Sequence, residues 1–431
     1  MVESGRGFTE NRYLCRQIIT DRENAMTTET FIHLHADDDV RSLALQKAKY
    51  PDVDMNYALD QIAGRQKARQ KLPLWAATDG IIYPPHLSME QCSSEFTATY
   101  KARLVREMIG HLRSSSLPTA PFLLVDLTAG FGVDFTMMAK ALSENGFSDG
   151  KMVCVEQQEG LCDVVRHNLP LLGVSQAEVI CADSVSFLHD LVFADVIFID
   201  PARRNVHGGR TYAISDCTPE ILSIEQELLS KAHYVVLKLS PMLDIVATVE
   251  ALGIERVREV HVISVANECK ELLVVLSEQG DSTKVFCVND QFSFSYPYLE
   301  NTPVPIAQQL SEGWYLYEPN ASLMKAKCFG MICKQYGVEA IGSNSHLFVS
   351  PYLLADFPGR KFHISAISSM NKKDLKTHLK GITQANITTR NFPLSVQELR
   401  RRLKLRDGGN TYIFATTVGQ TDHRLFICQL P

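Results

Sequence analysis

Four short apolar runs in the middle of the sequence each lead into an acidic residue. The runs cover residues 124–125, 152–155, 178–181 and 196–199, and the acids are Asp126, Glu156, Asp183 and Asp200. Stretches with apolar residues at helical spacing follow the runs, at residues 135–142, 161–172, 185–191 and 218–229. Strands and helices that alternate in this way predict an open parallel sheet with helices on its faces.

Three further apolar runs complete this sheet. A fifth strand is expected at 234–239, and the runs 257–264 and 271–276 are expected to form an antiparallel hairpin. Their apolar and polar residues alternate poorly, which is typical of strands that are covered on both faces. The pattern predicts an α/β, Rossmann-like sheet of seven strands.

The turn after the first strand has the residues of a nucleotide-type loop. The sequence Asp126-Leu-Thr128-Ala-Gly130-Phe-Gly132-Val-Asp134 leads directly into a helical stretch. Glycine allows backbone conformations closed to other residues and lets a ligand approach the main chain. A single glycine loop is weak evidence for a nucleotide-type site. The residues at the ends of the later strands therefore have to support it.

The ends of the later strands carry acidic residues suited to binding a nucleoside. Glu156 is placed to accept hydrogen bonds from two ribose hydroxyls, and the side chain or amide of Asp183 is placed to read an adenine edge. The fourth strand ends in Asp200-Pro201-Ala202-Arg203-Arg204. The ligand of such a sheet binds at these carboxyl ends.

These features resemble class I S-adenosylmethionine-dependent methyltransferases. In that family the first loop holds the methionine moiety, the second acid the ribose and the third the adenine, while the Asp-Pro segment faces the methyl acceptor. The resemblance implies cofactor contacts from Asp126, Thr128, Gly130, Gly132, Asp134, Glu156, Asp183 and Asp200.

Further motifs are similar to the methyltransferases with a THUMP-like domain found in Bacteroidetes, over the chain from about residue 28 to near its end. They lie at residues 62–69, 71–75, 90–95, 200–204, 391–394 and 403–409. The family implies S-adenosylmethionine as cofactor and RNA as acceptor. Two departures matter: Thr128 stands where many methyltransferases have a glycine, and Asp200-Pro-Ala-Arg replaces the Asp-Pro-Pro-Tyr of enzymes that methylate exocyclic amines.

Asp200, Pro201 and Arg203 are the catalytic candidates. Asp200 is expected to position the acceptor or accept its proton, although a helix-capping role is the structural alternative. Arg203 and Arg204 are candidates for holding a phosphate, or one of them pairs with Asp200. Lys238 is a further candidate for the acceptor pocket. A cysteine nucleophile is a less favoured alternative, with Cys269 the best placed.

The positive charge of the chain is concentrated near its C-terminus. Residues 360–406 contain twelve Lys or Arg and two acids, whereas the whole chain has a net charge of −6. Such a segment is typical of phosphate-backbone binding, and a solvated helix face is the alternative. The expected substrate contacts here are Lys372, Lys373, Arg390, Arg400, Arg401 and Arg402.

Breaks in the sequence pattern predict five parts, and the family resemblance implies the kinds of the last three. They are a disordered extension (1–27), a helical region (28–118), the S-adenosylmethionine-binding domain (119–278), a ferredoxin-like middle module (279–352) and a basic THUMP-like RNA-binding module (353–431). No apolar run reaches the length of a membrane span, and none resembles a secretory signal. Eleven cysteines without a CxxC pair indicate reduced thiols, no metal and a cytoplasmic protein.

Three functions remain open at this stage. The first is direct methylation of a nitrogen or oxygen of an RNA base, in tRNA or rRNA. The second is methylation of a protein or small molecule, with the basic segment as an assembly surface. The third is an RNA-binding protein that only senses the cofactor.

Overall fold

The computed structural model describes residues 26–115, 121–147, 149–203, 214–278, 280, 282–419 and 421–431, with the side chains of Ser115 and Arg203 excepted. The chain forms two compact units. The first contains the described residues up to Ala202 together with Thr218–Val236, and the second contains Arg203–Cys217 and Leu237–Pro431. The extension expected at 1–27 lies outside the described residues except for Met26 and Thr27.

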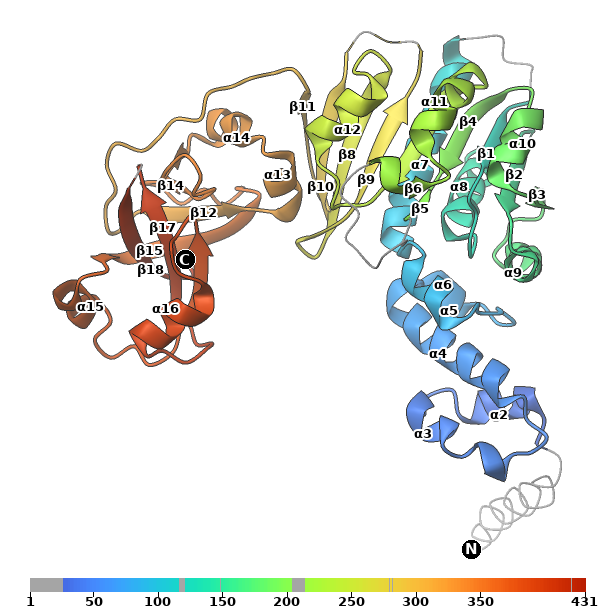
Figure 1. Ribbon diagram of the computed structural model, residues 1–431, viewed down its shortest axis with the longest axis horizontal. Helices are drawn as coiled ribbons and strands as arrows, with labels where there is room; N and C mark the ends of the chain where they lie inside the picture. The colour runs from blue at the N-terminus through green and yellow to red at the C-terminus, as the bar shows by residue number, and fades with distance from the viewer. Residues whose placement is uncertain are drawn as a thin grey trace, which may run out of the picture. The chain divides into compact units, whose positions relative to one another are not determined.

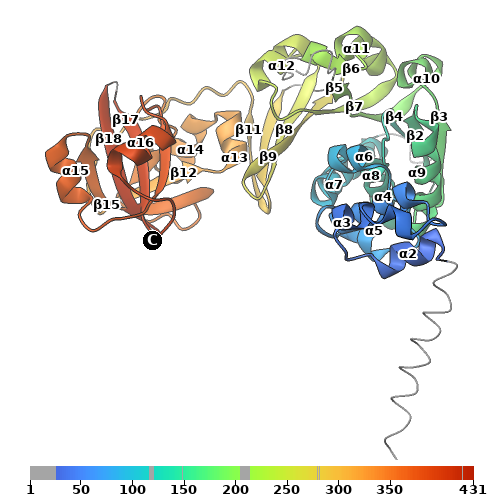
Figure 2. The ribbon, with the colours of Figure 1, turned by 60° about the horizontal axis from the view of Figure 1, so that its bottom comes forward.

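The first described part is helical, as expected. Its elements are α2 (Thr28–Leu34), α3 (Val40–Ala44), the short 3₁₀ helix η1 (Lys47–Lys49), α4 (Met55–Lys71), α5 (Pro73–Ala77), α6 (His86–Gln91) and α7 (Glu95–Ser115). The buried Trp75 on α5 packs into one cluster with Phe131 of the glycine loop. The end of α4 and the helices α5, α6 and α7 therefore pack around the loop, whereas α2, α3 and the start of α4 form a separate cluster. Figure 2 shows α7 beside α8 (Val133–Glu144), the helix that follows the loop.

The larger sheet contains the seven expected strands in the order β3-β2-β1-β4-β7-β9-β8, and β10 and β11 extend it beyond β8. Its strands are β1 (Leu123–Asp126), β2 (Lys151–Glu156), β3 (Ala177–Cys181), β4 (Ala194–Ile199), β7 (Ala232–Leu239), β8 (Val257–Val265), β9 (Glu268–Leu276), β10 (Lys284–Asn289) and β11 (Phe292–Pro297). The pairings of β1 with β2 and β4 and of β2 with β3 are parallel, and β8 and β9 form the expected antiparallel hairpin. The acidic strand ends therefore share one edge.

Helices connect these strands along the chain (Figure 1). They are α8 (Val133–Glu144), α9 (Glu159–Leu171), α10 (Ser184–Asp190), α11 (Ile221–Ser230) and α12 (Ile245–Leu252). The predicted start of α11 at residue 218 was wrong. Cys217–Thr218 forms the short strand β6, paired with β5 (Ala202–Arg203) after the 3₁₀ helix η2 (Ile214–Asp216), and the helix begins only after its N-cap, Glu220.

A second sheet of seven strands fills the C-terminal part, in the order β13-β14-β12-β15-β18-β17-β16. Its strands are β12 (Tyr315–Pro319), β13 (Glu339–Ala340), β14 (Phe348–Ser350), β15 (Gly359–Ser369), β16 (Asn386–Arg390), β17 (Tyr412–Val418) and β18 (Asp422–Gln429). Four helices accompany it, α13 (Ala321–Ala326), α14 (Phe329–Tyr336), α15 (Lys372–His378) and α16 (Val396–Leu403). Residues 321–336 form two helices rather than one, because Lys327 adopts a left-handed conformation that ends α13.

This second sheet is curled. Three strands separate β12 from β16, which would place them about 19 Å apart in a flat sheet at the usual strand spacing. Arg390 at the end of β16 nevertheless donates a hydrogen bond to Glu318 on β12, at 2.9 Å. The curled sheet encloses a core of Leu316, Phe362, Phe414 and Phe426.

Candidate functional site

Thr128 joins two of the strand ends that the sequence predicted to form the site. The buried Asp126 at the end of β1 accepts a hydrogen bond from the Thr128 amide at 2.9 Å. The Thr128 hydroxyl in turn accepts the amide hydrogen of Asp200, at the end of β4, at 2.6 Å. A glycine at position 128 has no hydroxyl to offer, so this departure from the common pattern fixes the start of the Asp200-Pro201 segment to the glycine loop.

The two glycines of the loop serve different purposes. Both have positive φ, 54° at Gly130 and 79° at Gly132, which side-chain-bearing residues rarely adopt. A Cβ on Gly130 would meet nothing within 4 Å, whereas one on Gly132 would come within 3.1 Å of Val165 on α9. Gly132 thus permits the close approach of α9, and Gly130 leaves space above the loop.

Glu156, at the end of β2, holds the glycine loop and the following loop together. Its side chain is buried, and one carboxylate oxygen accepts the Gly130 amide at 3.0 Å while the other accepts the Gln158 amide at 2.8 Å. Each carboxylate oxygen has a second lone pair. The carboxylate is therefore fixed in place and keeps capacity to accept further hydroxyl hydrogens.

Asp183 is the N-cap of α10. Its carboxylate accepts the Ser186 amide at 2.9 Å, and this hydrogen bond is the largest cause of the lowered pKa of Asp183. The carboxylate is therefore ionised at neutral pH and engaged with its own helix.

Asp134, in the first turn of α8, faces the N-terminal helices. One of its oxygens accepts a hydrogen bond from Ser93 at 2.7 Å, and the other lies 3.1 Å from the ammonium of Lys101. Lys101 is fully buried on α7 and also donates to Ser93 at 3.0 Å. These three residues dock α7 onto the helix that begins at the glycine loop.

Sequence reasoning did not identify the partners of Asp134. A signal was present, because the polar residues Ser93, Thr97 and Lys101 follow one another at intervals of four and are all buried. A polar stripe at helical spacing predicts one shared face. Nothing in the sequence indicated which residue that face would meet.

The remaining acceptor-side candidates are spread over both units. Asp200 is half-buried and Pro201 is buried at the end of β4. Arg203 has a described backbone in β5, but its side chain and the whole of Arg204 lie outside the described residues. Lys238 is half-buried near the end of β7, in the second unit.

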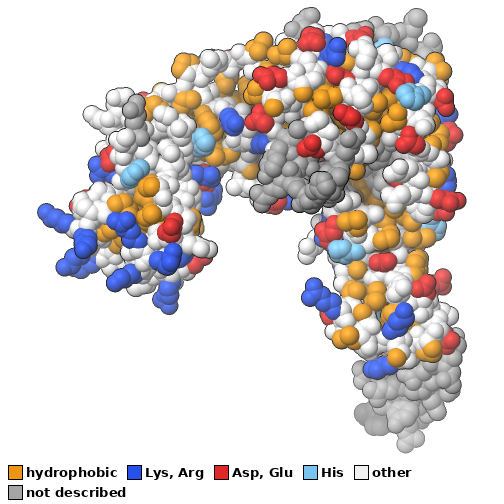
Figure 3. All heavy atoms as spheres, in the orientation of Figure 1, with side chains coloured by type: hydrophobic (Ala, Val, Ile, Leu, Met, Phe, Trp, Pro, Cys, Tyr) orange, Lys and Arg blue, Asp and Glu red, His pale blue; other side chains and the backbone are white. Residues whose placement is uncertain are grey.

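The predicted basic contacts lie on α15, β16 and α16. Lys372, Lys373, Arg401 and Arg402 are exposed. Arg400 pairs with Asp407 at 2.7 Å, and Arg390 pairs with Glu318. Figure 3 shows Lys and Arg side chains gathered over this C-terminal part. Two of the six predicted contacts are therefore already in ion pairs.

The residues at the strand ends fit S-adenosylmethionine. The space over Gly130 admits a ligand that approaches the main chain, and Glu156 presents fixed carboxylate oxygens of the kind that bind ribose hydroxyls. Thr128 and Gly132, which the sequence also predicts as cofactor contacts, hold the loop in place through the Asp200 amide and the close approach of α9.

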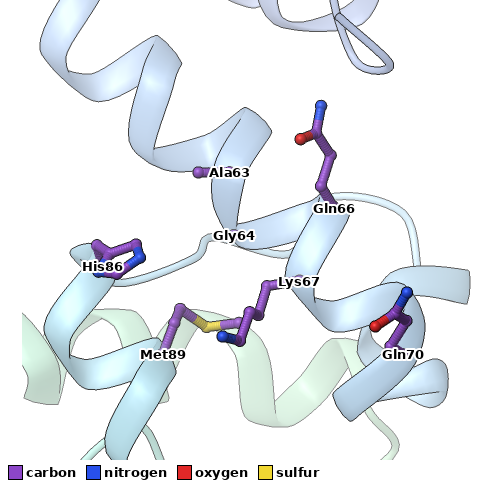
Figure 4. Close-up of a pocket in the computed structure, with 7 residues that line it drawn as sticks. All are labelled: Ala63, Gly64, Gln66, Lys67, Gln70, His86 and Met89. Atoms are coloured by element: carbon purple, nitrogen blue, oxygen red, sulfur yellow. The ribbon is translucent and has the colours of Figure 1, made fainter. Parts of the chain in front are cut away.

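A hollow of about 310 Å³ lies on the N-terminal helices. Figure 4 shows it between α4, which contributes Gln66 and Lys67, and α6, which contributes His86 and Met89. Lys67 forms an ion pair with Glu90. The lining contains no residue of the predicted cofactor site, so this hollow is a separate feature.

Two other kinds of site find no support. Burial raises the pKa of Cys269, which lies in β9, so its sulfur stays protonated at neutral pH and is a poor nucleophile. Across the described ranges, no cluster of three or more His, Cys, Asp or Glu is arranged to hold a metal ion. No described helix has the length and apolar character needed to cross a membrane.

Comparisons with known proteins give the family. Residues 359–430 match the THUMP domain-like family, and residues 315–358 match a ferredoxin-like domain. No curated protein matches the chain. The chain is 30% identical to the protein from Porphyromonas gingivalis W83 whose crystal structure bears the name "putative methyltransferase", with 93% of this chain and 96% of that chain covered and a TM-score of 0.75.

Two more distant structures share a smaller part. A SAM-dependent methyltransferase from Agrobacterium tumefaciens is 17% identical, with 43% of this chain and 61% of that chain covered and a TM-score of 0.29. The N-terminal domain of human METTL16, in complex with SAH, is 10% identical, with 57% and 95% covered and a TM-score of 0.35. Overlap of this extent carries no argument about the present chain.

The P. gingivalis relative spans nearly the whole chain, and the C-terminal matches fall on the second sheet. The strand order of the larger sheet agrees with the methyltransferase sheet that the sequence predicts. The chain belongs to the family of class I S-adenosylmethionine-dependent methyltransferases that carry a THUMP-like C-terminal domain.

Proposed function

We propose that this methyltransferase transfers a methyl group directly to a base of RNA, in tRNA or rRNA, in the cytoplasm. The observation that carries the choice of RNA is the exposed basic surface of the THUMP-like part, to which Lys372, Lys373, Arg401 and Arg402 contribute. Clustered Lys and Arg bind the phosphate backbone and release its counterions. The rest of the chain is acidic, so RNA is directed to this surface.

The cofactor supplies an electrophilic methyl group on a sulfonium. Glu156 holds the ribose hydroxyls, and the Gly130 turn lets the cofactor lie against the main chain. Asp126, Asp134 and Asp183 keep the surrounding loops in place through the hydrogen bonds described above. The N-terminal helices that pack on the loop exclude water from one side of the site.

Asp200 is the residue proposed to act on the acceptor. Its amide is held by Thr128, so the position of its backbone does not depend on the substrate. The carboxylate then orients the attacking atom of the base and accepts its proton where the atom carries one. Pro201 restricts the backbone that follows, and Arg203 and Arg204 are proposed to hold a substrate phosphate.

Binding of RNA tests the substrate class. A variant in which Lys372, Lys373, Arg401 and Arg402 are all replaced by Gln is expected to bind total RNA more weakly. The plot of log affinity against log salt concentration should become less steep by up to about 3, since each contact to a single strand contributes about 0.7. The matched control replaces Lys47 and Lys49, which are also exposed, by Gln and should leave the slope unchanged.

An unchanged slope in the fourfold variant would argue for a protein or small-molecule acceptor. RNA binding without any methyl transfer would instead support a cofactor-sensing RNA-binding protein.

A further inference from the structure

Two arginines converge on one buried carboxylate where the ferredoxin-like and THUMP-like segments meet. Glu318 on β12 has only 6% of its side chain exposed. One of its oxygens accepts hydrogen bonds from Nε, at 2.7 Å, and Nη2 of Arg360, at the start of β15. The other oxygen accepts Nη2 of Arg390 at 2.9 Å, from the end of β16. The group is called the Glu318 triad below.

The triad has an excess of positive charge that reaches the surface. One buried carboxylate neutralises one of the two guanidinium groups, so a charge of +1 remains. The Arg360 side chain is 47% exposed and that of Arg390 is 36% exposed. In the described part of the chain, neither Nη1 atom takes part in a hydrogen bond, and the buried Nε of Arg390 has no hydrogen-bond partner. The triad therefore keeps donors for an external anion.

The carboxylate also orients these donors. The planar guanidinium group of arginine matches the geometry of an oxyanion. An arginine side chain that is free in solution loses rotational freedom when it binds one. Glu318 already fixes both forks, and the guanidinium of Arg360 lies over the ring of Phe362 with 5.4 Å to its centroid. The ordering cost of binding an anion is therefore reduced.

The surroundings of the triad suit a nucleotide. Burial lowers the pKa of His346, and the positive charges of Arg390 and Lys327 lower it further. His346 stacks on Phe329 with ring centroids 4.7 Å apart and planes 28° from parallel. Both rings are half-buried, so part of this aromatic surface is accessible. Bases stack on such rings while the backbone meets the charges.

We propose that Arg360 and Arg390, held by Glu318, bind a phosphodiester group of the RNA substrate. The single charge of a phosphodiester matches the excess charge of the triad, and its two free oxygens match two fixed forks. This inference rests on the proposed RNA substrate and adds a specific contact to the exposed lysines and arginines of α15 and α16. If the triad were only structural, it would join β12 to β16, and loss of its arginines would not change the affinity for RNA.

The test compares three single substitutions in the full-length protein. Arg360→Gln and Arg390→Gln are each expected to weaken binding of a single-stranded RNA about five- to tenfold at 150 mM salt, and to reduce the salt slope by about 0.7. The matched control is Arg424→Gln on β18. Arg424 is 37% exposed and already paired with Asp422 at 2.8 Å, so its loss should change affinity less than about twofold.

Arg390→Lys separates charge from geometry. It keeps the positive charge but lacks the planar fork, so the salt slope should stay near the wild-type value while affinity falls. If Arg390→Gln does not fold, Arg390→Lys still tests whether Arg390 contacts RNA. Thermal melting of every variant monitors folding.

The proposal is overturned if the folded Arg360 and Arg390 variants bind RNA like the Arg424 variant, even where their melting temperatures fall. Failure of the wild-type protein to bind RNA in a salt-dependent way would instead contradict the proposed function itself.

Discussion

The hydroxyl of Thr128 is the smallest feature on which the geometry of the site depends. It accepts the amide of Asp200 at 2.6 Å, and its own amide is held by the buried Asp126. A short displacement of a catalytic group can reduce a rate by up to about a hundredfold. The position of Asp200 should therefore respond to changes at Thr128 that leave the fold intact.

Thr128→Val tests this link. Valine has the shape of threonine but no acceptor, so the Asp200 amide loses its partner, and we expect kcat for methyl transfer to fall about tenfold or more. Thr128→Ser keeps the hydroxyl and should retain most of the activity. Steady-state kinetics with labelled cofactor measures both. Equal rates for the two variants would show that the hydrogen bond does not position Asp200.

At the residue scale, the sequence predicted positions better than partners. Asp126, Glu156 and Asp200 lie at the strand ends where the pattern of apolar runs placed them. The ion pair of Arg390 was not foreseen, because its partner Glu318 is 72 residues away along the chain. Contacts of this kind depend on how the sheet curls, which no local pattern records.

At the scale of elements, α7 is connected to α8 by a buried charge. Lys101 is fully buried, and its ammonium lies between Ser93 and Asp134. Removing one member of a buried ion pair leaves the other charge without compensation, which costs about 3–5 kcal/mol. Since α8 begins at the glycine loop, this contact also sets the loop against the N-terminal helices.

Lys101→Met should therefore lower the free energy of unfolding of the first unit by about 3 kcal/mol or more. The double variant Lys101→Met with Asp134→Leu removes both charges and should recover much of that loss, because apolar groups of similar size replace a buried pair with little cost. Urea denaturation followed by circular dichroism measures both. A double variant no more stable than Lys101→Met would argue against a charge-pairing role.

Element boundaries were predicted correctly where the local spacing of apolar residues determines them. They were missed where tertiary contacts determine them. The alternation of strands and helices in the larger sheet was predicted from the spacing of apolar residues. The structure confirms its seven expected strands. The two strands β10 and β11 were assigned to the middle module and not foreseen as part of this sheet, although the Phe-Ser-Phe-Ser-Tyr run of β11 alternates regularly. The break at Lys327 was also missed, since a lysine in a left-handed conformation is set by its surroundings.

The ferredoxin-like and THUMP-like segments share one sheet. β12 belongs to the first segment and β15 to the second, and they pair directly from Tyr315 with His363 to Pro319 with Gly359. At Gly359 a Cβ would come within 2.1 Å of the Glu318 carbonyl oxygen, so the contact admits no side chain. The Glu318 triad lies at this same joint, and a sequence boundary therefore falls inside one structural body.

At the scale of the whole molecule, the chain combines a methyltransferase sheet with a basic C-terminal sheet. The family and cofactor follow from the relationship to the P. gingivalis protein and from the matched C-terminal domains. The acceptor is the central proposal. It depends on the charge distribution, since the most basic segment of an acidic chain forms the THUMP-like part.

Transfer of a labelled methyl group from S-adenosylmethionine tests that proposal most directly. The wild-type protein and the Asp200→Ala variant are incubated with labelled cofactor and with total RNA from cells that lack the protein, and label is counted separately in RNA, protein and small molecules. We predict label in a nucleobase of RNA with the wild-type protein, and a loss of at least about a hundredfold with the variant. Label confined to protein or small molecules, or no transfer by the folded wild-type protein, would contradict the account.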